Sequence, residues 1–133
     1  EFPDRITFTG AIPRENLGVA YAAMDIFVFP SLKDTQGWVL HEAPLAGLPV
    51  VLLDKGVTSA VIDGENGFYV DNSPEAVSEK VIELLADDAL RARMSIRSVE
   101  MASHFTEKSH VAKLIALYGR VIENHHSLRE LER

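Results

Sequence analysis

Two acidic residues flank a short apolar stretch that begins with glycine. Asp34 and Glu42 are separated by seven residues, and Gly37 lies between them. A carboxylate accepts hydrogen bonds from two neighbouring hydroxyls, so it suits a sugar diol. A helix that begins at Gly37 would offer unpaired N–H groups and partial positive charge, which together attract anions. This pattern predicts a binding element for a diphosphate that joins two polyhydroxyl groups.

The spacing of the two carboxylates fits such a ligand. Eight helical residues rise roughly 12 Å at 1.5 Å each, and the loop position of Asp34 shortens that separation. A sugar, a diphosphate and a ribose in line fit this range. On spacing alone an alternative is open, in which Asp34 is only a loop or capping residue and Glu42 only a solvated helix face. The stretch also lacks a G-x-G-x-x-G motif and a P-loop lysine.

The surrounding pattern alternates between strands and helices. Apolar runs predict strands over residues 6–9, 25–30, 48–53 and 68–70, and helices over residues 13–24 and 37–46. This order implies right-handed crossovers and a parallel sheet. We therefore expect an α/β fold, a Rossmann-like parallel sheet with flanking helices. The loop over residues 31–36 follows the second strand, at the edge of the sheet where ligands bind.

The second half of the chain reads as helical from Ser73 onward. Ser73 with Pro74, either Asp87 or Asp88, and Thr106 are predicted to cap three helices that cover the sheet. The last helix would carry an apolar face of Val111, Ile115, Tyr118 and Ile122. Residues 123–133 are predicted to form a polar, frayed tail of a single domain that spans residues 1–133.

Composition narrows the classes of function. The 133 residues are 47% hydrophobic, enough for one modest core. A net charge of −7 argues against nucleic acid as a partner, because an acidic chain repels phosphate backbones. No cysteine is present, which excludes disulfides and thiolate metal sites and fits a reducing compartment. No apolar run approaches the roughly 20 residues of a membrane span.

Several motifs resemble the C-terminal part of retaining GT-B glycosyltransferases of family four. They are "FTG", "YAAMDIFVFPS", "DTQGWVLHEAPLAGLPVV" and "VIDGENGFYV", in the order and spacing of that family, and the likeness covers residues 6–122. The resemblance implies the N-terminally truncated half of a GT-B fold. It also implies the donor-binding part of an enzyme that moves a hexose from a nucleotide sugar to an acceptor hydroxyl with retention. No metal or other cofactor is expected.

The resemblance also suggests roles for individual residues. The family has two glutamates where this chain has Asp34 and Glu42; the first meets the donor sugar and the second the ribose, so we expect them to be the catalytic pair. The expected donor contacts are Ile12, Ser31, Gln36, Gly37, Trp38 and Val39. Asp34 is one methylene shorter than glutamate and loses about 1 Å of reach, which leaves donor preference and activity open. The triplet at residues 35–37 resembles members that glucosylate diacylglycerol, which would make a glycolipid from UDP-glucose.

The resemblance implies that further parts of the family's fold would precede residue 1. They are an earlier strand with a basic Arg/Lys pair and the N-terminal acceptor domain. The expected partners are thus a UDP- or GDP-hexose and that acceptor domain, with membrane contact only through absent parts. The location would be cytoplasmic, or peripheral at the inner face of the membrane in the full-length protein. We expect the isolated chain to bind donor weakly or not at all and to be inactive. The alternatives are a non-catalytic nucleotide-sugar-binding or regulatory domain and a GT-B nucleotide-sugar epimerase.

Two neighbours of the acidic pair invite other roles. His41 adjoins Glu42, but adjacent helix residues point about 100° apart, so the two side chains need not share a site. Trp38 is more typical of a core residue than of a platform for a sugar. His104 and His110 are predicted on helix surfaces, and no histidine pair has a convincing metal spacing.

Overall fold

The centre of the fold is a three-stranded parallel sheet. The computed structural model describes residues 5–35, 37–53 and 55–131, with side chains as far as residue 125. The strands are β1 (Phe27–Phe29), β2 (Val50–Leu52) and β3 (Gly67–Tyr69), and they lie in the order β1-β2-β3. Val51 of β2 pairs with Val28 on one side and with Phe68 on the other, both in parallel register. The predicted α/β class and parallel sheet are confirmed.

The helices follow the predicted order; those predicted over residues 13–24 and 37–46 are shorter than expected, and the last one is longer. They are η2 (Arg14–Asn16), α1 (Leu17–Ala22), α2 (Val39–Leu45), α3 (Pro74–Ala86), α4 (Asp88–Ala102) and α5 (Glu107–Leu131). The predicted caps are confirmed: Ser73 Oγ accepts from Ala76 N at 3.1 Å, and Asp87 Oδ1 accepts from Leu90 N at 2.8 Å. Thr106 Oγ1 likewise accepts from Ser109 N at 3.2 Å. Each cap satisfies one N–H group that the first helical turn leaves unpaired.

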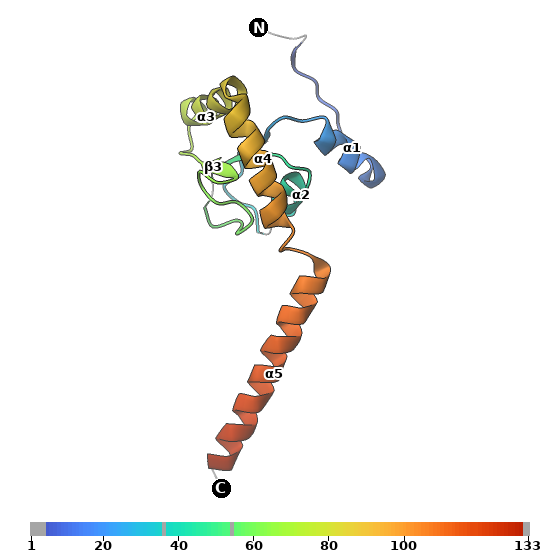
Figure 1. The fold of residues 1–133 in the computed structure, drawn as a ribbon, viewed down its shortest axis with the longest axis vertical. Helices are drawn as coiled ribbons and strands as arrows, with labels where there is room; N and C mark the ends of the chain where they lie inside the picture. The colour runs from blue at the N-terminus through green and yellow to red at the C-terminus, as the bar shows by residue number, and fades with distance from the viewer. Residues whose placement is uncertain (1–4, 36, 54, 132–133) are drawn as a thin grey trace.

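Both faces of the sheet are covered by helices. Val50 and Leu52 pack against Leu40 of α2, whereas Val51, which lies between them, packs against Leu84 of α3 and Met94 of α4. Successive strand residues point to opposite faces, so a continuous apolar run suits a strand buried on both sides. Figure 1 shows α3 and α4 beside β3, with α2 behind α4.

A smaller apolar cluster joins α1 to α2. Its buried members are Tyr21, Ala43 and Leu48, with Leu17 and Phe27 packed against them. The α2 helix ends at this cluster: Gly47, at a φ of +79°, follows its last turn, and Leu48 N donates to Ala43 O at 3.1 Å. The predicted role of Gly47 as the C-terminal cap of the helix is confirmed.

Residues 6–9 do not form the strand that their composition predicts. Phe8 is 93% exposed, and no strand in the described part of the chain pairs with this segment. Aromatic and β-branched residues favour a strand through packing and cross-strand pairing, and both require a neighbour. The first predicted strand is therefore wrong for this structure.

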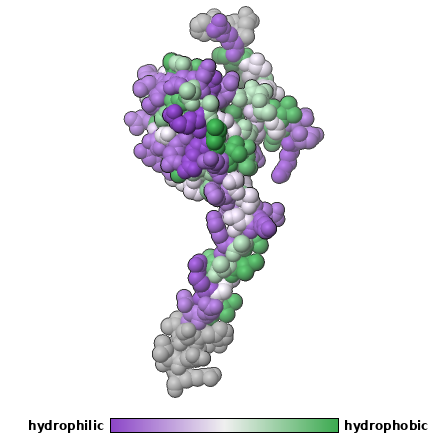
Figure 2. All heavy atoms as spheres, viewed as in Figure 1, coloured by the Kyte–Doolittle hydropathy of each residue, from purple (hydrophilic) through white to green (hydrophobic). Residues whose placement is uncertain are grey.

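The last helix does not cover the sheet. Figure 1 shows α5 leaving the body, and Figure 2 shows apolar residues exposed on the part of this helix whose side chains are described, up to residue 125. The predicted apolar face is present but exposed at Val111, Ile115, Tyr118 and Ile122. The helix continues to Leu131, through the segment expected to fray. A helical periodicity determines which residues share a face, but it does not determine what that face packs against.

Candidate functional site

The loop between β1 and α2 holds the first candidate carboxylate. Asp34 is exposed, and its Oδ1 accepts a hydrogen bond from Gly37 N at 2.7 Å. Gly37 has a φ of +49° and is buried, and Leu40 N donates to its carbonyl at 2.7 Å. A left-handed φ is incompatible with an α-helix, so α2 begins at Val39 and the predicted start at Gly37 is wrong. Asp34 thus closes the turn that leads into α2.

This turn occupies one of the N–H groups that the predicted anion site would offer to a phosphate. The Gly37 N–H was expected to hold a diphosphate, but in the structure it donates to Asp34. A phosphate oxygen would have to compete with that carboxylate for the same hydrogen. Of the loop or capping role that spacing alone left open for Asp34, Oδ1 takes the loop role: it closes the turn before α2, and no side chain among the described residues caps the helix itself.

The second carboxylate, Glu42, is exposed in the middle of α2. Its Oε2 accepts a hydrogen bond from the Tyr21 hydroxyl at 2.9 Å. In the part of the chain that the structure describes, Oε1 has no hydrogen-bond partner. Burial, followed by the hydrogen bond to Glu42 and its negative charge, raises the pKa of Tyr21 to about 12. Sequence reasoning missed Tyr21, although its place on the apolar face of α1 already pointed it toward the protein interior.

The remaining expected donor contacts lie in and around the same loops. Ser31 is half-buried, and its Oγ accepts from Lys33 N at 3.4 Å. Ile12 is half-buried in the loop before η2. Val39 packs with the core cluster around Leu40, so only its backbone is suited to contact a polar ligand. Gln36 lies outside the described residues.

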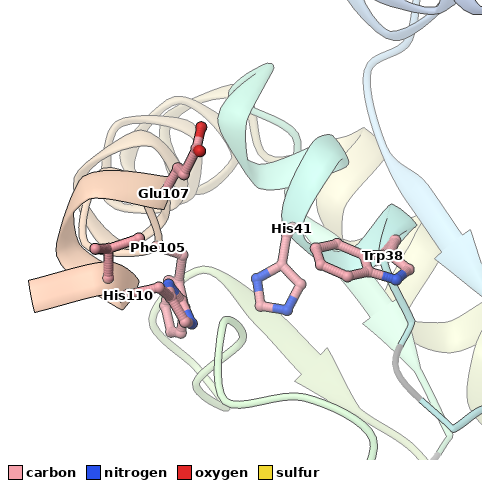
Figure 3. A pocket seen from close by; sticks show the side chains of 6 residues that line it. Trp38, His41, Phe105, Glu107 and His110 are labelled. Atoms are coloured by element: carbon pink, nitrogen blue, oxygen red, sulfur yellow. The ribbon is translucent and has the colours of Figure 1, made fainter. Parts of the chain in front are cut away.

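Trp38 and His41 line a cavity of about 550 Å³ at the junction of α2 with α5. The other lining residues are Phe105, Glu107, His110 and Val111. Trp38 is 69% exposed, so its interpretation as a core residue is wrong. Figure 3 shows the His41 ring between Trp38 and Phe105, whose ring centroid lies 5.0 Å from that of His41. Neither Asp34 nor Glu42 lines this cavity, so it is distinct from the acidic pair.

The electrostatics of this cavity centre on His41. Its Nδ1 is buried, and within the described residues it has no hydrogen-bond partner. Burial lowers the pKa of His41 below its ordinary value, and the nearby His110 lowers that pKa further. The described residues contain no group of three or more His, Asp or Glu side chains placed to hold a metal ion. Among the described helices, none is both long and apolar enough to cross a membrane.

Comparison with known proteins gives a consistent family. Residues 1–87 match the family described as glycosyl transferases group 1. A D-inositol 3-phosphate glycosyltransferase of Corynebacterium glutamicum (strain R) is 38% identical over 90% of this chain, which spans only 29% of that relative. Sucrose-phosphate synthase of Thermosynechococcus elongatus matches with a TM-score of 0.80 and 29% identity, over 91% of this chain and 31% of the synthase.

A pneumococcal O-GlcNAc transferase, solved in complex with UDP and GlcNAc, shares the fold with a TM-score of 0.73 and 24% identity. That likeness covers 90% of this chain and 25% of the transferase. The parallel sheet, its flanking helices and these neighbours agree with the predicted half of a GT-B fold. With a match to the family over residues 1–87, the chain belongs to the glycosyl transferases of group 1.

Proposed function

We propose that this chain is the donor-binding part of a glycosyltransferase that moves a hexose from a nucleotide sugar to an acceptor hydroxyl with retention. The observation that carries the proposal is the position of the acidic pair. Asp34 lies in the loop that leaves the carboxyl end of β1, and Glu42 lies in the helix that follows, both inside the segment that matches the family. Ligands of parallel sheets bind at that edge.

The two carboxylates would share the donor between them. Glu42 presents Oε1 to a ribose hydroxyl while Oε2 stays bonded to Tyr21. Asp34 would meet hydroxyls of the hexose, with Ser31, Gln36, Gly37 and the backbone of Trp38 and Val39 close to the diphosphate, and Ile12 beside the base. The chain would supply orientation and stabilisation of the leaving diphosphate, and no nucleophile. The proposal requires no bound metal.

The proposed donor is one class of compound, whereas two acceptors are candidates. A UDP- or GDP-hexose is the donor, and the acceptor site belongs to parts of a longer polypeptide outside this chain. The triplet at residues 35–37 favours a diacylglycerol acceptor, whereas the name of the corynebacterial relative favours an inositol phosphate. An acceptor screen with both compounds distinguishes the two. We place the enzyme in the cytoplasm, since a chain without cysteine fits a reducing compartment.

Titration of the full-length protein with UDP- and GDP-hexoses tests the proposal. Replacing Glu42 by glutamine removes a charged acceptor, so donor affinity should fall by about 10-fold or more. The matched control is Glu75→Gln, an exposed glutamate in the first turn of α3 that should leave affinity unchanged. NMR of the product should show the anomeric configuration of the donor. The proposal fails if neither donor binds, or if the two variants behave alike.

A substitution at Asp34 distinguishes the proposed function from its alternatives. In a retaining transferase, Asp34→Glu restores the reach that the family has at this position, and the transfer rate of the full-length protein should rise. A non-catalytic or regulatory domain would show no transfer in either form. An epimerase would convert the nucleotide sugar without any acceptor, which product analysis detects directly.

A further inference from the structure

Tyr21 links two elements that the sequence keeps apart. It lies in α1, is only 8% exposed, and reaches Glu42 across 21 positions of sequence. Its ring packs in the cluster with Ala43 and Leu48 and meets the ring of Phe27 edge-on, with centroids 6.0 Å apart and planes at 61°. Packing on several sides leaves the ring little freedom, so its hydroxyl is held at a fixed point beside α2.

The Tyr21 hydroxyl donates to Glu42, a residue at the protein surface. Glu42 is exposed, and an exposed glutamate ordinarily samples several rotamers, whose loss costs free energy when a ligand binds. The hydroxyl donates to Oε2 at 2.9 Å and so selects one orientation of the carboxylate in advance. The raised pKa of Tyr21 keeps this donor protonated throughout the physiological pH range.

We propose that Tyr21 is a positioning residue, which holds Glu42 Oε2 so that Oε1 faces the ribose diol of the donor. This inference rests on the proposed function, because it assigns the ribose to Glu42. It predicts that part of the affinity for a ribonucleotide depends on a side chain that never touches the ligand. The effect should be absent for a nucleotide without the diol.

The experiment compares Tyr21→Phe with wild type in the full-length protein. Phenylalanine keeps the ring and its packing and removes only the hydroxyl. Calorimetric titration uses UDP and GDP beside their 2′,3′-dideoxy counterparts. We expect the dissociation constant of the ribonucleotide to rise about 3- to 10-fold, which reflects the cost of ordering one long side chain. The dideoxy analogue should bind both proteins equally.

Two further variants keep the outcomes separate. Tyr118→Phe makes the same chemical change at an exposed tyrosine of α5 and should leave every constant unchanged. In a Glu42→Gln background, Tyr21→Phe should have little additional effect on ribonucleotide binding, since the charged carboxylate it positions is gone. Thermal melting of each variant confirms that it is folded.

Three results have distinct meanings. If wild type binds no nucleotide, or if Glu42→Gln binds as wild type does, the proposed function is overturned and the role of Tyr21 with it. If Glu42→Gln weakens binding but Tyr21→Phe does not, the positioning role alone is overturned. If Tyr21→Phe weakens ribonucleotide and dideoxynucleotide equally, Tyr21 is merely structural, and the inference is again overturned.

Discussion

Replacing Gly37 by alanine should destabilise the fold by about 2–3 kcal/mol, and the structure separates this cost into two parts. The first is the left-handed backbone, with φ at +49°, which costs a residue with a Cβ atom about 1–2 kcal/mol. The second is crowding, because the new methyl group would lie 2.9 Å from Leu40 Cδ1 and 3.3 Å from Val57 Cγ2. Moving the end of the Leu40 side chain off its rotamer costs about 1 kcal/mol more.

Gly64→Ala is the matched control for this measurement. Gly64 also has a left-handed φ, +75°, but an added Cβ meets nothing within 4 Å. Its substitution should therefore cost only the backbone part, about 1–2 kcal/mol. Both variants gain the same small benefit from a less flexible unfolded chain, which cancels in the comparison.

Urea unfolding of the chain and its two variants measures both parts. Gly37→Ala should have a lower midpoint than Gly64→Ala, with an unchanged slope m for all three proteins. Equal losses would show that Leu40 and Val57 do not crowd the turn. If neither variant lost stability, the left-handed turn that Asp34 closes would itself be wrong.

Three further predictions concern the pH response, a helix cap and the isolated chain. Folding lowers the pKa of His41 below its ordinary value of 6.5, so the unfolded chain takes up this proton before the folded chain does as the pH falls. The neutral imidazole therefore contributes fully to the stability of the fold above pH 6.5, and this contribution is lost as the pH falls toward the lower pKa of the folded state. Urea midpoints at about pH 7.5 and about pH 5.5 should therefore differ more for wild type than for His41→Phe, and equal differences would contradict the lowered pKa. Asp87→Ala should cost about 1 kcal/mol of unfolding free energy, and Asp88→Ala less, because only Asp87 accepts from Leu90 N; equal losses would argue against the cap. The isolated chain should bind UDP- and GDP-hexoses weakly or not at all and should form no glycoside, so rapid transfer by this chain in a product assay would disprove the dependence on absent parts.

Much of the candidate site could be placed from sequence. The types and spacing of Asp34 and Glu42 mark them as candidates, and the resemblance of the surrounding motifs to a known family suggests their roles. The strand before them is predicted from its continuous apolar run. Their surroundings could not be predicted: the bond from Gly37 N to Asp34 and the bond from Tyr21 to Glu42 depend on a backbone turn and on the packing of α1 against α2. The position of the His41 ring likewise depends on its contact with Phe105, which lies in the loop before α5, far along the chain.

The sequence alone determined the local features of this protein. Ser73, Asp87 and Thr106 cap helices through bonds to residues three positions later, and Gly47 ends α2, so each depends only on neighbouring residues. The tertiary structure decided everything that requires a partner from elsewhere in the chain. Residues 6–9 have strand composition without a neighbouring strand, and α5 has an apolar face that lies away from the sheet. The physical reason is that a cap or a periodicity is complete within one or two helical turns, whereas pairing, burial and the orientation of a carboxylate depend on which distant surfaces meet.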